Sequence, residues 1–217
     1  MPDLNRIPEA TVYRLSLYHC YLGELIRRGS ADVRVTSREL AKELDIREET
    51  VRRDLSYVGG VGRPGAGYQL FVLFEALQQF LGLCDEYPII RVGTAQMLQA
   101  LQVVFPADAY GVRPVAYYSE LPEDVGTVVG GIEVRHVTEI PRLDVSLEVR
   151  VALVACSPGW IDPVLEMLNE ADVTGVLLLT PKVKLDRPER MNVRHIRMPC
   201  DIKSLAHGCR IPSAVGV

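Results

Sequence analysis

The chain has 217 residues, enough for one large or two small domains, and 48% of them are hydrophobic, which suffices for a packed core. Its formal net charge of −4 excludes a protein that coats nucleic acid or anionic membrane over its whole surface, although a local basic patch is compatible with it. No stretch approaches the roughly 18 consecutive apolar residues of a transmembrane helix, and the start MPDLNRIPEA has no apolar signal core.

The cysteines are odd in number and widely spaced, with no C-x-x-C pair and no grouping with histidine at zinc spacing. We therefore expect free thiols in a reducing compartment, a cytoplasmic location, no metal site and no membrane partner. The five cysteines are Cys20, Cys84, Cys156, Cys200 and Cys209.

The first 82 residues predict four helices and a hairpin. Apolar residues at helical spacing predict a first helix over 8–29, and Thr36 with Glu39 forms a capping box that begins a second. A third helix, REETVRRDLSYVGG, is expected to bury Val51, Leu55 and Val58, although Arg47 at its start is a poor cap. The five glycines and one proline over 59–67 then predict a tight hairpin, and QLFVLFEALQQFLGL predicts a fourth helix. This order indicates a winged helix-turn-helix.

From residue 89 onward, short β-branched runs alternate with helical stretches near 94–104 and 160–171. Such alternation predicts a parallel sheet with right-handed crossovers. The expected architecture is an α/β chain in which a Rossmann-like sheet domain follows the winged helix-turn-helix and precedes a carboxy-terminal helix. The predicted domains are residues 1–82, 86–198 and 199–217.

A helix that enters the major groove needs hydrogen-bond donors on its outward face, and the third helix has them beside its apolar positions. Arg47 at the helix start suits a nearby phosphate, and Arg63 in the hairpin suits a minor groove. The alternatives are solvated charges on a surface helix and a loop that contacts no DNA. The donors of the third helix are Arg52, Arg53, Ser56 and Tyr57.

Several segments together resemble the bacterial redox-sensing repressor family called Rex: IPEATVYRLSLY, SRELAKEL, VRRDLSYVGGVGRPGAGY, VGGIEV and IKSLA. The resemblance runs from Ile7 to about His207. It implies a homodimeric repressor that binds a double-stranded DNA operator, senses the NADH/NAD ratio in its Rossmann domain and swaps its last helix onto the partner subunit. It also implies DNA contacts by the third-helix donors and by Arg63, Gly65 and Gly67, while Pro64 stands where a wing cation is common.

The first turn of the sheet domain departs from the dinucleotide-binding pattern. A Rossmann turn needs three glycines, and their places hold Gly93, Ala95 and Leu98. The methyl of Ala95 is expected to crowd a pyrophosphate, and Leu98 is expected to push the helix off the strand. By resemblance, Ser119 stands where an aspartate would bind the adenosine ribose. The turn and helix start that remain favour an anionic group, and comprise Gly93, Thr94, Ala95, Gln96, Met97 and Leu98.

Two further positions take their roles from the resemblance. The family pairs an arginine of the first helix, matching Arg14, with an aspartate whose place here is Arg197, so two arginines would repel and the switch is expected to differ. The segment CSPGW brings Cys156 and Ser157 to the place of nicotinamide-facing residues, where Trp160 suits either ring stacking or core packing.

The sequence therefore predicts a DNA-binding repressor with a diverged nucleotide site, and it leaves ordinary NAD or NADH binding, another ligand and no ligand open. A rival sensor is a thiol, with Cys156 at a strand end and Cys200 near the cations Arg197 and Lys203. A third alternative is a co-regulator that binds nothing and pairs with a functional relative. A small NAD-dependent enzyme is disfavoured, because the four histidines offer no convincing proton-transfer group and no serine elbow or Walker motif is present.

Overall fold

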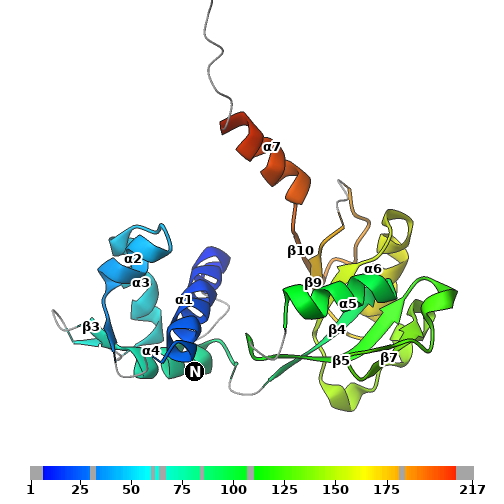
Figure 1. Cartoon of the computed structure of the whole chain (residues 1–217), viewed down its shortest axis with the longest axis horizontal. Coiled ribbons are helices and arrows are strands. Elements are labelled where there is room, and N and C mark those ends of the chain that lie inside the picture. The colour runs from blue at the N-terminus through cyan, green and yellow to red at the C-terminus, as the bar shows by residue number, and fades with distance from the viewer. Residues whose placement is uncertain are drawn as a thin grey trace, which may run out of the picture. The chain divides into compact units, whose positions relative to one another are not determined.

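The structure is a computed structural model that describes residues 7–29, 33–59, 62–63, 67–83, 86–106, 110–180 and 184–208. The chain divides into two compact units, Met1–Asp85 and Glu86–Val217, which are coloured blue to cyan and green to red in Figure 1. Each unit has its own hydrophobic core.

The first unit is built from four helices around one apolar core. The capping box predicted at Thr36 is present, since the Thr36 side chain accepts a hydrogen bond from the Glu39 amide and the Glu39 carboxylate accepts one from the Thr36 amide. Leu15, Tyr18 and Leu22 are fully buried, whereas Val12, Leu25, Ile26 and Val58 are only half-buried. The helices are α1 (Glu9–Arg27), α2 (Ser37–Glu43), α3 (Glu48–Val58) and α4 (Leu70–Phe80).

A small antiparallel sheet completes the winged helix that the sequence predicts. Its order is β1-β3-β2, and the hairpin strands pair Gly62 with Tyr68 and Arg63 with Gly67. The two-residue strand β1 was not predicted from the sequence, because two residues carry no periodic signal. The strands are β1 (Arg34–Val35), β2 (Gly62–Arg63) and β3 (Gly67–Gln69).

The second unit contains a seven-stranded sheet in the order β10-β9-β8-β4-β5-β7-β6. All neighbouring strands are parallel except the edge pair β6 and β7, so the expected Rossmann-like architecture is confirmed. The elements are β4 (Tyr87–Gly93), α5 (Ala95–Val104), β5 (Val112–Ser119), β6 (Val128–Val129), β7 (Ile132–His136), β8 (Val151–Ala155), α6 (Ile161–Glu170), β9 (Gly175–Leu178) and β10 (Asn192–His195).

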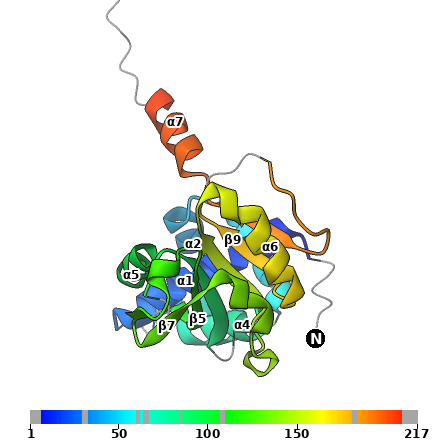
Figure 2. The same cartoon turned by 90° about the vertical axis from the view of Figure 1, so that its right-hand side faces the viewer.

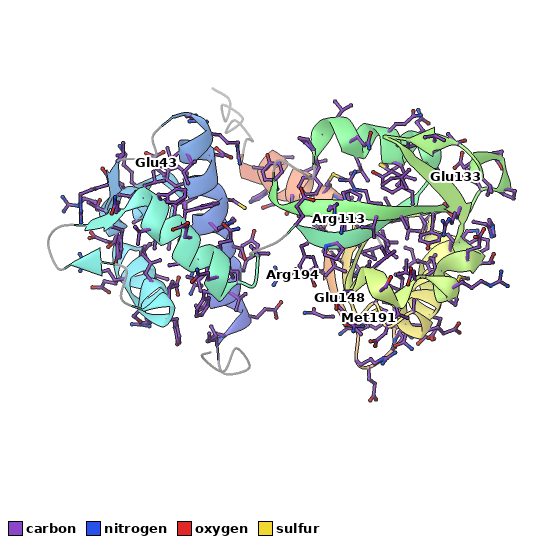
Figure 3. All side chains as sticks on the ribbon, turned by 90° about the horizontal axis from the view of Figure 1, so that it is seen from below. Glu43, Arg113, Glu133, Glu148, Met191 and Arg194 are labelled. Carbon is purple, nitrogen blue, oxygen red and sulfur yellow. The ribbon has the colours of Figure 1, made fainter. Side chains whose placement is uncertain are left out.

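The helices α5 and α6 cover opposite faces of this sheet, as Figure 2 shows on either side of the strands. Leu98 of α5 packs with Tyr117, whereas Leu165 of α6 lies in the larger cluster with Tyr118. Tyr117 and Tyr118 are consecutive in β5, and consecutive side chains of a strand point to opposite faces. Strand ends and edges carry exposed polar residues, including Arg113, Glu133 and Arg194, which are labelled in Figure 3.

The last helix, α7 (Met198–Gly208), confirms the predicted carboxy-terminal helix. It follows β10 (Figure 1). The side chains of residues 198–207 are all exposed in the single chain. None of the described helices is both long and apolar enough to span a membrane.

Candidate nucleic-acid interface and nucleotide crevice

The outward face of α3 carries the predicted DNA-reading side chains. Val51 and Leu55 are buried in the core, and the four donors project from the opposite side of the helix. This separation follows from the helical period of 3.6 residues. The exposed donors are Arg52, Arg53, Ser56 and Tyr57.

Two of these side chains have contacts that the sequence did not predict. The Arg52 guanidinium pairs with the Glu48 carboxylate one turn earlier, and the Ser56 hydroxyl donates to the Arg53 carbonyl oxygen at 2.6 Å. No carboxylate in the described part of the chain forms an ion pair with Arg53. Arg53 is therefore the α3 cation most available for a phosphate or a base edge.

Arg47 stands at the amino-terminal cap of α3 without a side-chain capping bond, as predicted, and its side chain is exposed. The first amides of α3 carry a partial positive charge that favours an anion. A DNA phosphate near Arg47 would meet both the guanidinium and these amides.

In the wing, Arg63 belongs to β2 and Gly65 lies outside the described residues. Gly67 adopts φ +67°, and a Cβ added to it would lie 2.8 Å from the Val35 carbonyl oxygen. A residue with a side chain would therefore strain the backbone and collide with β1. Close packing of β3 against β1 explains this glycine without any DNA contact.

Asp54, a site residue that the sequence reasoning missed, lies on the inner side of α3 and is 1% exposed. Arg14 donates to it through Nε at 2.6 Å and Nη2 at 2.8 Å, and the Tyr18 hydroxyl donates at 2.9 Å. The hydrogen bond from Arg14 to Asp54 raises the pKa of Arg14, and burial is the main cause of the raised pKa of Tyr18. A signal was available, because position 54 falls between the buried Val51 and Leu55 on the apolar side of α3.

Arg14 and Arg197, the two predicted switch positions, belong to different units. Arg14 is engaged with Asp54 inside its own unit. Arg197 is exposed just before α7, and its carbonyl oxygen accepts hydrogen bonds from the amides of Cys200 and Asp201.

The predicted nucleotide residues gather where β4 turns into α5. Gly93 ends β4 close to β8, since an added Cβ would lie 3.4 Å from the Ala155 carbonyl oxygen. Thr94 caps α5 by accepting a hydrogen bond from the Met97 amide at 3.2 Å. Gln96 and Met97 are exposed on the first turn. Leu98 is fully buried against Tyr117, so its side chain lies between α5 and the sheet.

The first α5 amide already has a partner from the chain itself. The Ala95 amide donates to Asp124 Oδ2 at 2.8 Å, and the fully buried Ser119 hydroxyl donates to the same oxygen at 2.7 Å. Asp124 belongs to a single 3-10 turn, η3 (Pro122–Asp124), and was not singled out in the sequence.

The loop after β8 brings Ser157 to the same edge of the sheet, where its amide donates to Glu120 Oε1 at 2.8 Å.

The cysteines differ in their exposure. Cys156 is 2% exposed and belongs to the core, whereas Cys20 and Cys200 are exposed. The protein around the Cys20 side chain partly desolvates its thiol, and this desolvation raises the pKa of Cys20. Trp160 packs against the core and meets His136 edge to face, with ring centroids 6.2 Å apart. Cys84 and Cys209 lie outside the described residues.

No group of three histidine, cysteine, aspartate or glutamate side chains among the described residues could hold a metal ion. The histidines lie in separate elements, with His19 in α1, His136 in β7, His195 in β10 and His207 in α7. These histidines therefore do not form a proton-transfer pair with one another in the described part of the chain.

Solved structures resemble this chain over nearly its whole length. A chain described as RSP, a Rex-family repressor, in complex with beta-NAD+ and operator DNA has a TM-score of 0.79 and 22% sequence identity, with 93% of this chain and 92% of that chain covered. The same protein in complex with beta-NADH has a TM-score of 0.77 and 20% identity, with 94% of each chain covered. At such identities the likeness concerns the fold.

The amino-acid sequence also matches a family model and curated proteins. Residues 6–56 match the family described as "Putative DNA-binding protein N-terminus". A "Redox-sensing transcriptional repressor Rex" of Listeria welshimeri is 28% identical over 207 residues, 95% of each chain. The protein of that name from Streptomyces griseus is 33% identical over 200 residues, 92% of this chain and 78% of the relative. The chain thus belongs to the Rex family of redox-sensing transcriptional repressors.

Proposed function

We propose that the chain is a cytoplasmic homodimeric repressor, not an enzyme, which binds an operator through α3 and the wing. The observation that carries this proposal is the two-sided character of α3. Its inner side is fixed by Val51, Asp54 and Leu55, and its outer side presents four donors that are free of core packing. A helix anchored in this way can hold base-reading side chains at a fixed register in the major groove.

The phosphate contacts of this proposal come from Arg47 and Arg53, with Arg63 assigned to the minor groove beside the wing. Arg52 reaches a base only if it leaves Glu48, which is held one helical turn away. Glu48 therefore restrains Arg52 in the free protein, and operator binding exchanges that ion pair for DNA contacts.

The proposed dimer contact includes α7. Met198, Ile202 and Leu205 are 52%, 64% and 68% exposed, and their spacing places them on one side of the helix. An exposed apolar stripe of this kind is typical of a protein–protein interface. A second copy of the chain supplies it in this proposal, and the two-fold symmetry of such a dimer predicts a palindromic operator.

The proposed ligand of the sheet unit is NAD or NADH at a diverged site, bound at the β4 to α5 turn. Gly93 and the start of α5 support binding of an anionic group, whereas Ala95, Leu98 and Ser119 replace the residues that favour a dinucleotide. Cofactor-independent repression is the second candidate, and it is favoured by the carboxylate of Asp124 on the Ala95 amide.

Selection from a random duplex library tests the DNA-binding proposal. The full-length protein is expected to enrich a palindromic sequence at low ionic strength, and the recovered site should be retarded in a gel. Addition of NADH should then alter the retardation if the sheet unit is a nucleotide sensor. Absence of any enriched sequence under both oxidising and reducing conditions would overturn the repressor assignment. Retardation that is indifferent to NADH would support the cofactor-independent candidate.

A further inference from the structure

The crevice at the carboxyl end of β4 is the ligand position of this sheet. In the strand order, β4 lies between β8 and β5, and the chain leaves β4 toward β5 before it returns to β8 on the other side. Ligands of open α/β sheets bind outside the carboxyl ends of the strands at such a reversal, with the pyrophosphate at the start of the first helix. Here that helix is α5, and its first amide is that of Ala95.

Asp124 occupies the position of a phosphate oxygen on this helix. Its Oδ2 accepts hydrogen bonds from the Ala95 amide at 2.8 Å and from the Ser119 hydroxyl at 2.7 Å. A carboxylate at a helix amino terminus satisfies an amide and complements the helix dipole, as a phosphate does. The chain therefore supplies its own anion, from a residue 29 positions after the amide that it binds.

Ser119 holds this carboxylate in place and has no proton left for another acceptor. Its hydroxyl donates to Asp124 and accepts from the Leu121 amide at 3.1 Å, and the residue is fully buried. A serine hydroxyl has one proton and two lone pairs. A ribose hydroxyl at this position could only donate to the remaining lone pair of Ser119, and a phosphate on α5 would have to displace Asp124.

Glu120 places a second carboxylate at the same crevice. Because β5 and β8 flank β4, the hydrogen bond from the Ser157 amide to Glu120 Oε1 crosses the carboxyl end of β4. Glu120 is 5% exposed, and its Oε2 is buried with no hydrogen-bond partner among the described residues. An unsatisfied carboxylate oxygen favours a ligand that offers an N–H or O–H donor, such as a ribose hydroxyl.

We propose that Asp124 is the specificity-determining residue of this crevice, and that its carboxylate lowers the affinity of the crevice for phosphate-bearing dinucleotides. This inference rests on the proposed role of the sheet unit as a ligand sensor. A dinucleotide must displace Asp124 from the Ala95 amide and place its pyrophosphate near the displaced carboxylate. A ligand that has donor groups and no phosphate at this place does not need to displace Asp124, and its binding is not weakened by repulsion between two negative charges.

The test is binding of NADH to the full-length protein, followed by nicotinamide fluorescence, for the wild type, Asp124→Ala and Asp124→Asn. Asp124→Ala should bind NADH at least about tenfold more tightly than the wild type, a difference of about 1.4 kcal/mol in binding free energy. Asp124→Asn keeps the shape and removes the charge, so it should also tighten binding, by a smaller factor. The matched control is Glu123→Gln, which removes an exposed charge from the same turn and should leave the affinity unchanged.

Adenosine, measured by calorimetry, separates charge from space because it lacks phosphate. Its affinity should change by less than about twofold between the wild type and the Asp124 variants. Equal tightening for adenosine and NADH would overturn the inference, because the substitution would then only have opened the crevice. Unchanged NADH affinity, or no measurable NADH binding by either Asp124 variant, would overturn it as well. The DNA-selection experiment needs no nucleotide, so its result does not depend on the outcome of these binding measurements.

Discussion

The Arg14 guanidinium on α1 donates two hydrogen bonds to the Asp54 carboxylate on α3, through Nε at 2.6 Å and Nη2 at 2.8 Å. This pair ties the first helix of the chain to the inner side of the proposed DNA-reading helix. The resemblance to the family assigned Arg14 to a switch with an aspartate near the carboxy terminus, where this chain has Arg197. In this chain Asp54 of α3 engages Arg14 within the first unit, so a change in Arg14 should act on α3 directly.

We expect Arg14→Met to lower the free energy of unfolding of the first unit by about 3 kcal/mol, because it leaves the buried Asp54 carboxylate with the Tyr18 hydroxyl as its remaining side-chain donor. Urea unfolding followed by circular dichroism measures this change. The matched control is Arg28→Met at the carboxy-terminal cap of the same helix, where the exposed pair with Glu24 at 3.6 Å should contribute less than about 1 kcal/mol. Equal stability of the two variants would show that the Arg14 pair is as weak as a surface pair.

Arg53→Ala should weaken operator binding by about 1–3 kcal/mol, roughly fivefold to 150-fold, because Arg53 is exposed on the outward face of α3. If its contact is a phosphate, the dependence of log affinity on log salt should also fall by about one. Fluorescence anisotropy with a labelled duplex at several salt concentrations measures both quantities. Arg150→Ala, at an exposed arginine of the other unit, is the control and should leave the affinity and the salt dependence as in the wild type.

His19 should make the first unit less stable in acid. Burial lowers the pKa of His19, its Nε2 has no partner among the described residues, and its ring stacks on Phe74 with centroids 4.4 Å apart. The unfolded chain binds the proton more readily than the folded chain. The stability from the neutral ring is therefore fully present above the unfolded pKa of about 6.5, and is lost as the pH falls through the lower folded pKa.

His19→Phe should consequently flatten the decline in unfolding free energy between about pH 7 and pH 5, because phenylalanine keeps the stacking on Phe74 and cannot be protonated. Urea unfolding at pH 5, 6 and 7 checks this expectation. His207→Gln removes an exposed histidine from α7 and should retain the wild-type slope. A His19→Phe slope equal to that of the wild type would assign the acid sensitivity to other groups.

Leu205→Asp should weaken the proposed dimer by tenfold or more in dissociation constant, because a charge would replace an apolar side chain of the exposed α7 stripe. Light scattering over a concentration series measures the change. His207→Asp introduces the same charge on the opposite side of α7 and should leave the dimer intact. Dimers of equal strength in both variants would exclude the stripe from the interface.

The sequence predicted the elements well because their signals are local. The capping box at Thr36, the glycine-rich hairpin and the alternation of β-branched runs with helices each lie within a short window. The missed contacts join distant residues, such as Asp124 with Ala95 and Glu120 with Ser157, which are 29 and 37 positions apart. Only the strand order brings the ends of β5 and β8 to the same crevice.

Individual substitutions in the nucleotide turn were visible in the sequence, but their combined effect was not. The family resemblance implied that Ser119 replaces an acidic residue, and the sequence gave no reason to connect that hydroxyl with Asp124. A hydrogen bond from a replaced residue to a new carboxylate depends on the conformation of the short turn at Pro122–Asp124.

The buried side chain of Leu98 bears on how this family member could change further. Leu98 fills the space between α5 and the sheet with no exposed surface. Replacement of a buried leucine by a much smaller residue costs about 2–5 kcal/mol, because a cavity remains. A single mutation to the glycine of the dinucleotide-binding pattern would thus destabilise the fold. A stable glycine at this place requires compensating changes at neighbours such as Tyr117 and Val134.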